Sequence, residues 1–451
     1  MTEKSGTRPS RRDVLRLGSL FVAGALAGCS FGERPPQGTE TPDSTTQQPP
    51  ETQTPDASLP YDLSQFETVV NMVDAGADPT GSESIVPLLT AHAGSNTALY
   101  FPRGRYLMDD VWEIRAFENF GIVGDSAIIV PPTGYDRYLF NIGTDQEPVA
   151  TGLLFAGIRF DFRAPNTSPR PLQIAVTDGL VVKDVLAVGS SGTARFGVTD
   201  PNGTGLVEGL QLHNDGDLDA FPAGCFVGPD NLGELTFKDC HIVGFPNNGL
   251  YASSSVGPVN VIGGFYQNNG IANVRVSSPA VVRGVHILCD SAPAGFQNMR
   301  GLRLRNGESV LVEDCTIEML DVTYSEGGIV IESLMESATI RNTKVVTSAD
   351  GVPAIHAKTL ENRDADAAIR CESVTIRGDA SDDAAIRIVD RNNCVFEDVS
   401  IVQSGANRDG FHLLRANNTL LRNVEIAVTK VPVVVDQSEF VSENVTIGTP
   451  L

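Results

Sequence analysis

The chain has 451 residues and a strong acidic bias, with 56 Asp and Glu against 33 Lys and Arg and a formal net charge of −23. This charge argues against nucleic acid as a partner, because it repels the phosphate backbone. It is also typical of proteins adapted to high salt, where the Debye length falls to about 3 Å and only local contacts decide ligand binding. The seven cysteines include no Cys-x-x-Cys pair, which argues against a zinc site.

Residues 1–29 have the features of an export signal. Paired arginines at positions 11 and 12 precede an apolar run over residues 17–27 that is too short to span a membrane. The tetrapeptide Leu-Ala-Gly-Cys that ends at Cys29 resembles a lipobox, so Cys29 becomes the lipid-modified first residue of the mature protein. We therefore expect export by the twin-arginine pathway and an extracellular protein anchored in the membrane by lipid. The alternative is an ordinary cleaved signal in which Cys29 has no role.

The next segment, residues 30–65, is rich in Thr, Pro and Gln and cannot bury enough apolar surface to fold. We expect a disordered tether, followed by a single domain over residues 66–451. At the start of that domain, residues Thr80 to Glu83 have the pattern of a capping box for a helix over residues 85–89. A strand follows over residues 99–106, with the sequence Leu-Tyr-Phe-Pro-Arg-Gly-Arg-Tyr.

From residue 155 to the C-terminus a short pattern recurs: apolar, polar, Asp/Asn/Gly, apolar, any, apolar. Eleven steps between Ile158 and Val445 give about 26 residues per unit, a solenoid period. Apolar residues alternate on both sides of a polar turn, which is a strand signal and not a helical one. Such units stack as a parallel β-helix of about twelve coils, a rod on the order of 50 Å long.

Three cysteines fall on apolar positions of this pattern, which indicates small core residues: Cys240, Cys315 and Cys371. A disulfide framework is the alternative in an exported protein.

The capping segment and the repeats, which together cover residues 66–451, resemble the pectate-lyase-like superfamily. The resemblance implies an all-β fold, a single-stranded right-handed parallel β-helix with an N-terminal capping helix. It does not bring the polygalacturonase mechanism, because the Asn-Thr-Asp and Gly-His-Gly elements of those enzymes are missing. The export signal, the lipobox and the acidic balance further resemble an exported lipoprotein of halophilic archaea.

Each unit has a companion strand some 10 to 18 residues after the turn. A residue between two inward apolar side chains must point outward, so these strands predict a row of outward residues spaced by one coil. Arginine in such a row suits an anionic polymer, because guanidinium binds carboxylate or sulfate in a bidentate manner. The alternative is that exposed strand positions merely tolerate these residues. The predicted row is Tyr251, Arg275, Arg303, Val330, His356, Arg387 and His412.

Two loops carry candidate carboxylates. Asp215, Asp217 and Asp219 alternate along one loop and could ligate Ca²⁺, with a solvated acidic loop as the alternative. Glu318 and Glu326 lie between the two strands of one coil and could form an acid/base pair, with a polar surface loop as the alternative.

These features predict a cell-surface β-helix protein that binds, and in one version degrades, an acidic polysaccharide. In a lyase, Arg303 or Arg387 would remove the proton next to a uronate carboxylate that Arg or Ca²⁺ neutralises. In a glycoside hydrolase, Glu318 and Glu326, or carboxylates between Asp215 and Asp219, would serve. Substrate would contact Tyr251, Arg275, His356 and His412. The alternative is a non-catalytic adhesion or cell-envelope protein.

Overall fold

The computed structural model describes residues 61–143, 149–215, 221–362 and 368–450, all within the second of two units, Ser58–Leu451. The predicted signal, Cys29 and the tether up to residue 60 lie outside the described residues. Within the described ranges, no helix is long and apolar enough to cross a membrane.

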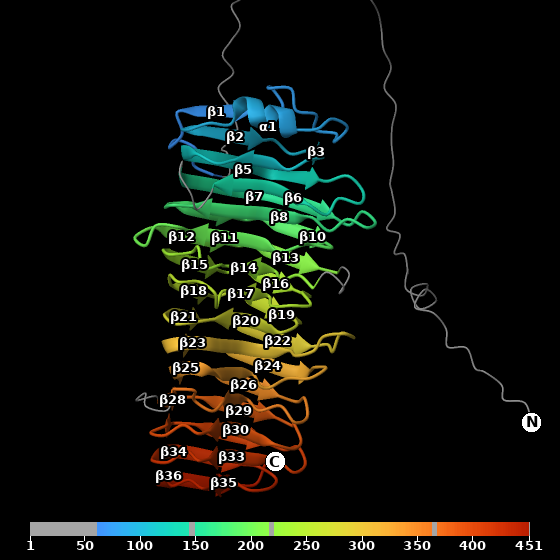
Figure 1. The fold of residues 1–451 in the computed structure, drawn as a ribbon. Helices are drawn as coiled ribbons and strands as arrows, with labels where there is room; N and C mark the ends of the chain where they lie inside the picture. Colours follow the sequence, from blue (N-terminus) through green and yellow to red (C-terminus); the bar gives the residue numbers. More distant parts are fainter. Residues whose placement is uncertain (1–60, 144–148, 216–220, 363–367, 451) are drawn as a thin grey trace, which may run out of the picture. The chain divides into compact units, whose positions relative to one another are not determined.

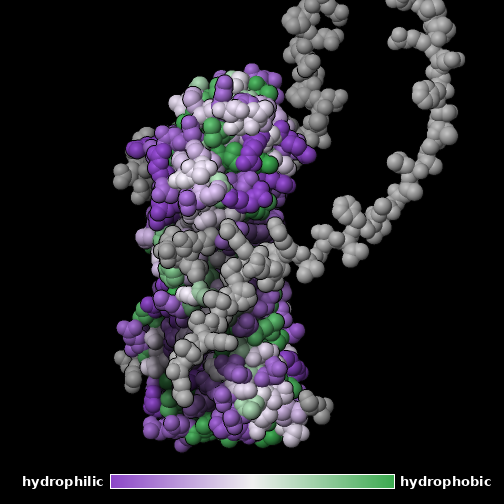
Figure 2. All heavy atoms as spheres, turned by 90° about the vertical axis from the view of Figure 1, so that its right-hand side faces the viewer, coloured by the Kyte–Doolittle hydropathy of each residue, from purple (hydrophilic) through white to green (hydrophobic). Residues whose placement is uncertain are grey.

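The strands of this unit coil into a column of parallel sheets, shown from blue at the start to red at the end in Figure 1. Each strand pairs in parallel with strands one coil before and after it, and there are about thirteen turns. The predicted all-β parallel β-helix is therefore confirmed, with a coil number close to the predicted twelve. Hydrophilic side chains cover most of the face of the column that is visible in Figure 2.

Three sheets run along the column. The turn-entry sheet contains the strands that lead into the short polar turn: β1 (Thr68–Asn71), β2 (Thr97–Phe101), β5 (Phe117–Val130), β7 (Ala150–Phe162), β9 (Leu180–Lys183), β12 (Thr204–Glu208), β15 (Glu234–Lys238), β18 (Val259–Ile262), β21 (Ala280–Arg283), β23 (Arg300–Glu313), β25 (Ile329–Arg341), β28 (Ile369–Glu372), β31 (Val395–Glu397), β34 (Thr419–Ala427) and β36 (Phe440–Gly448).

The turn-exit sheet contains the strands that leave this turn: β3 (Arg105–Leu107), β10 (Leu186–Gly189), β13 (Gln211–Asn214), β16 (His241–Val243), β19 (Phe265–Gln267), β22 (His286–Asp290), β24 (Thr316–Asp321), β26 (Lys344–Thr347), β29 (Thr375–Gly378) and β32 (Ser400–Gln403). The long strands β5, β7, β34 and β36 continue through the turn and belong to both sheets.

The companion sheet contains the remaining strands and the first halves of β23 and β25. Its other strands are β4 (Trp112–Ile114), β6 (Tyr138–Gly143), β8 (Arg170–Val176), β11 (Ala194–Val198), β14 (Cys225–Phe226), β17 (Leu250–Tyr251), β20 (Ala272–Val276), β27 (Ile355–Ala357), β30 (Ala384–Val389), β33 (Asp409–Leu414) and β35 (Val433–Asp436).

From Gly157 onward, the short turn of each coil bends at a residue of positive φ, which is the Asp/Asn/Gly position of the sequence pattern in every coil but that of Ser373. In one coil Gly263 and Gly264 both have positive φ. Gly adopts this backbone freely, and Asn and Asp adopt it more readily than other residues. The side chains also bond along the column, since Asn423 Nδ2 donates to Asp398 Oδ1 at 3.0 Å and Asn444 Nδ2 donates to Asn423 Oδ1 at 2.9 Å. From Gly157 onward the turn residues are Gly157, Asp184, Gly209, Asp239, Gly263, Gly284, Asp314, Asn342, Ser373, Asp398, Asn423 and Asn444.

The inward side chains of the three sheets form one continuous apolar core. Phenylalanines of neighbouring coils meet edge to face, as Phe140 and Phe155 do at a centroid distance of 5.2 Å. The six cysteines in the described ranges are buried and free, which confirms that they serve as core residues. They are Cys225, Cys240, Cys289, Cys315, Cys371 and Cys394.

The predicted capping helix is present as α1 (Val86–His92), and its residue Leu89 is fully buried. The predicted capping box is wrong, because Ile85 occupies the N-cap and no side chain caps the helix. The Thr80 hydroxyl is instead bonded to the Asp78 carboxylate at 2.7 Å, and that carboxylate also accepts the Ser82 backbone N–H at 2.7 Å. These bonds, led by that of Thr80, hold the pKa of Asp78 at about 2.

Residues 61–66, here called the strap, lie across the outside of the turn-entry sheet. Leu63 and Phe66 are buried there against residues of β2 and β5. Further along the column, the Tyr61 hydroxyl donates to Asp184 Oδ2 at 3.0 Å. Burial and this carboxylate raise the pKa of Tyr61. Residues 61–65, predicted as tether, therefore pack on the solenoid.

Candidate functional site

The predicted row exists as a line in register, and all of its members except Val330 are at least partly exposed. The companion strands pair in parallel so that Tyr251 aligns with Arg275, Arg275 with Arg303, and the remaining members follow in order to His412. We call this line the outer row. It also continues toward the N-terminus through residues that the sequence prediction missed: Phe226, Arg195, Gln173 and Asn141. Arg195 carries the same signal as the predicted members, an Arg between two buried apolar residues.

Arg275 is held in the outer row by uncharged groups. Its guanidinium lies 4.1 Å from the centroid of the Tyr251 ring, and its Nε donates to Ser253 Oγ at 2.6 Å. Burial lowers the pKa of Arg275 to about 10, and the positive charges of Arg303 and Arg305 add to this effect. Arg275 thus stays protonated at neutral pH, with an aromatic face as its main support.

Next along the row, two carboxylates bind three cations. Arg303 Nε lies 2.6 Å from Glu332 Oε1, and Lys358 Nζ lies 3.1 Å from Glu332 Oε2 and 2.9 Å from Glu326 Oε1. Arg300 bonds the other oxygen of Glu326. Only 9% of the Arg300 side chain and 8% of the Glu332 side chain are exposed, so this network is largely sheltered from water.

The charges of this network keep both carboxylates ionised. Burial acts to raise the pKa of Glu326, but Lys358 and Arg300 outweigh it and the pKa is lowered. Burial likewise opposes ionisation of Glu332, and Arg303 and Lys358 bring its pKa below the usual range. Together with Arg275 and Arg305, the site has five cationic side chains and two carboxylates. We call it the cationic cluster; it consists of Arg275, Arg300, Arg303, Arg305, Lys358, Glu326 and Glu332.

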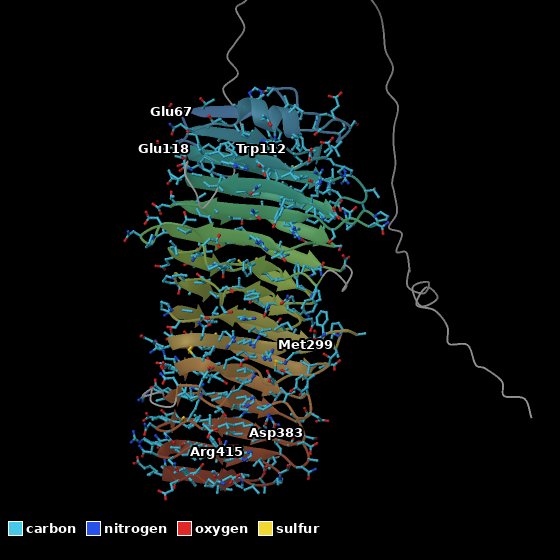
Figure 3. All side chains as sticks on the ribbon, in the orientation of Figure 1. Glu67, Trp112, Glu118, Met299, Asp383 and Arg415 are labelled. Carbon is cyan, nitrogen blue, oxygen red and sulfur yellow. The ribbon has the colours of Figure 1, made fainter. Side chains whose placement is uncertain are left out.

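The C-terminal part of the row is more sheltered than predicted. Val330 lies in register but is fully buried, because the backbone at Gly327 passes close to it. His356 Nδ1 lies 3.1 Å from the Glu326 carbonyl, which can only accept, so Nδ1 carries the proton. Burial lowers the pKa of His356. Arg387 Nη1 lies 3.3 Å from Asp383 Oδ2. In Figure 3 the label of Asp383 lies toward the C-terminal end of the column, and that of Trp112 toward its N-terminal end.

The predicted pair of Glu318 and Glu326 does not assemble. Glu318 belongs to β24 of the turn-exit sheet, and its Oε2 lies 2.8 Å from His286 Nε2. His286 ends a line of rings on that sheet that meet edge to face, with centroid distances of 4.8 to 5.0 Å. The two glutamates are close in sequence, but Glu318 projects from the turn-exit sheet whereas Glu326 lies in the connection between β24 and β25. The other rings of the line belong to Phe265, His241 and His213.

The calcium prediction falls largely outside the described residues, since Asp217 and Asp219 lie there. Asp215 is described, and its charge acts on Arg163. In the described parts of the chain, no group of three or more His, Cys, Asp or Glu side chains could hold a metal ion. Calcium binding at Asp215, Asp217 and Asp219 stays a prediction.

A cavity of about 380 Å³ opens on the companion sheet, on the N-terminal side of the cationic cluster. Its lining includes the four outer-row residues that the sequence prediction missed, together with Arg115 and Asp230. The residues two positions after the outer-row members are small, and three of them line the cavity, so backbone forms much of its floor: Gly143, Ala175 and Gly228. Gly197 has the equivalent position in β11.

No protein-family model matches the chain, and no curated protein matches it significantly by sequence. Among solved structures, the A-module of the mannuronan C-5 epimerase AlgE4 from Azotobacter vinelandii is similar, with a TM-score of 0.50 and 12% identity over 85% of this chain and 100% of that module. PfbA, a surface adhesin of Streptococcus pneumoniae, has a TM-score of 0.49 and 12% identity over 84% of this chain and 93% of its own. At this identity the likeness to the epimerase module shows the fold alone, a right-handed parallel β-helix.

Proposed function

We propose that this protein binds an acidic polysaccharide along the outer row, through the cationic cluster. The observation that carries the proposal is the local excess of positive charge. Five cationic side chains face two carboxylates on one stretch of a chain whose formal net charge is −23. Carboxylate or sulfate groups of a polymer would restore the balance, and a polymer along the column would meet one rung about every 4.8 Å.

Two arginines of the cluster remain available for a ligand. Arg305 has no ion pair with any described residue, and Arg275 contacts only a hydroxyl and an aromatic ring. The other cations are engaged by Glu326 and Glu332. We therefore assign the ligand contacts to Arg275 and Arg305, and assign to Arg300, Arg303 and Lys358 the role of setting the local potential.

Binding without cleavage is the activity that these contacts support. Glu326 and Glu332 each bridge two cations and stay ionised, so neither is suited to donate a proton to a leaving group. Arg303 and Arg387 are each engaged by a carboxylate, Glu332 and Asp383, so neither guanidinium is free to act on a substrate proton. Polysaccharide lyase or hydrolase activity stays a prediction.

We place this binding at the cell surface, with the protein exported by the twin-arginine pathway and anchored by lipid at Cys29. The support is the sequence: paired arginines before a short apolar run, and the tetrapeptide that ends at Cys29.

The test is titration of the purified full-length protein with polygalacturonate, alginate and dextran sulfate at several NaCl concentrations. We expect binding that weakens with salt, and an affinity at least about tenfold lower in the double variant Arg275→Ala/Arg305→Ala, since each charge-assisted contact contributes about 1.5 kcal/mol or more. Arg370→Ala is the matched control, because Arg370 is an exposed arginine of the turn-entry sheet whose one ion pair with a described residue is to Glu372.

Equal binding by the parent and the double variant would reject the cationic cluster as the site. New reducing ends, or the absorbance of unsaturated uronates, are followed in the same samples. We expect neither product. If either appears, the proposed function must be changed from binding alone to enzymatic cleavage.

A further inference from the structure

The cavity beside the outer row differs from the cationic cluster in its charge. Arg195 and Asp230 both line it, and neither forms an ion pair with a described residue. Arg115 also lines it and lies 3.6 Å from Glu113. Two arginines, Arg115 and Arg195, are thus balanced in number by two carboxylates, Glu113 and Asp230. The cavity therefore has no excess positive charge to attract an anion.

The polar groups around the cavity are fixed in position. Asn141 Nδ2 donates to Glu113 Oε1 at 2.8 Å, and Gln173 Nε2 donates to Asn141 Oδ1 at 3.2 Å. These two hydrogen bonds orient the Gln173 amide, and its Oε1 accepts no hydrogen bond from a described residue. The Arg195 guanidinium rests 5.1 Å from the centroid of the Phe226 ring, which holds it without neutralising it.

The Asp230 carboxylate can lie where it does because the nearby residues Gly197 and Gly228 have no side chains. A Cβ at Gly228 would overlap Asp230 Oδ1, and a Cβ at Gly197 would come within 3.3 Å of Asp230 Oδ2. The carboxylate therefore lies close over bare backbone, at the edge of a space that no side chain fills. Acceptors at Asp230 and Gln173 and a donor at Arg195 border one cavity beside an aromatic ring.

We propose that this cavity binds an uncharged sugar residue through its hydroxyl groups. Hydroxyls donate to Asp230 and Gln173 Oε1 and accept from Arg195, so every group that loses water gains a partner. Four coil steps separate β11, which carries Arg195, from β23, which carries Arg303, and these span about 19 Å. The ligand is then a heteropolysaccharide with acidic and uncharged residues. The inference deepens the proposed function. It rests on that function only for the acidic residues of the polysaccharide, which would bind the cationic cluster.

The experiment is calorimetry of the full-length protein with cellohexaose, mannohexaose and a galactohexaose at 0.1 M and 2 M NaCl. We expect at least one hexaose to bind, with less than a twofold change in affinity between the two salt concentrations. Ala175→Leu fills the cavity without removing a polar group and should abolish this binding. Asp230→Asn should weaken it about tenfold or more, which is the loss of one charged hydrogen bond.

Thr375→Leu, which introduces the same side chain on the turn-exit sheet, should leave hexaose binding unchanged, and so should Arg275→Ala/Arg305→Ala. Failure of every hexaose to bind, or binding that survives Ala175→Leu, overturns the inference. The two proposals fail separately, because polygalacturonate binding depends on Arg275 and Arg305 and should persist in Ala175→Leu.

Discussion

Two buried arginines connect successive coils near the cationic cluster. Arg391 is 1% exposed and donates to the backbone carbonyls of Glu332 and Lys358 at 2.8 Å and of Glu336 at 2.9 Å. Arg408, deeper toward the C-terminus, is also fully buried and donates chiefly to carbonyl oxygens. Burial lowers the pKa of both to about 10, so both remain charged at neutral pH. Carbonyl dipoles thus take the place of a carboxylate.

Arg391→Met should lower the free energy of unfolding by about 3 kcal/mol, because three buried carbonyls lose their donor at a cost of about 1 kcal/mol each or more. Urea denaturation followed by far-ultraviolet circular dichroism measures the change. Arg103→Met is the control, since Arg103 and its partner Asp125 are both exposed, with 77% and 43% of their side chains accessible, and such a pair contributes about 1 kcal/mol or less. An equal loss in the two variants would contradict this role for Arg391.

The residue just before each short turn shows why part of the structure was open to prediction and part was not. Its position follows from the period-2 pattern, but the pattern records only that it is polar. In two stretches of three coils the signs alternate, and in the first of them Glu208 lies between Lys183 and Lys238 at 3.1 and 2.6 Å. Glu313 lies in the same way between two arginines, at 2.7 and 2.6 Å. Such pairs join residues about 25 to 30 apart, so they appear only once the register is known.

The same limit explains the candidate site. The alternation within each companion strand predicted the line from Tyr251 to His412 correctly. It could not predict that the Val330 side chain is buried. It also could not predict that Glu326 pairs with Arg300 and Lys358, or that Glu318 pairs with His286 on the turn-exit sheet. Those outcomes depend on the paths of the connections between strands, which carry no periodic signal.

At the level of the turn, a matched pair of glycines separates backbone strain from crowding. Gly263 and Gly284 have nearly equal φ, +65° and +66°, but a Cβ at Gly263 would overlap Asp239 Oδ1, whereas a Cβ at Gly284 meets nothing closer than 3.8 Å. Gly284→Ala should cost about 1 to 2 kcal/mol from the left-handed backbone alone. Gly263→Ala should cost more, because the Asp239 side chain must move. Denaturation midpoints of the two variants test this, and equal midpoints would contradict it.

For the molecule as a whole, the acidic excess predicts a stability that increases with salt. The 56 Asp and Glu outnumber the 33 Lys and Arg, and the surface ion pairs use many of the cations. The remaining carboxylates repel one another, and compact states suffer most from that repulsion. Thermal unfolding should shift to higher temperature between 0.1 and 2 M NaCl, with sucrose at equal osmolality as the uncharged control. A midpoint that stays constant or falls in NaCl would refute the prediction of adaptation to high salt.

The strap gives the column a particular response to force. It crosses the coils of β2, β5, β7 and β9, and Tyr61, its first residue, is held beside Asp184 on the flank. Tension on the chain before Tyr61 is therefore applied to the side of the column and not to α1 or the first coil. It would detach Tyr61, then Leu63, then Phe66, one contact at a time, before any coil is loaded. The contacts of the strap would thus be lost under weak pulling while the companion sheet, which carries the outer row, stays intact.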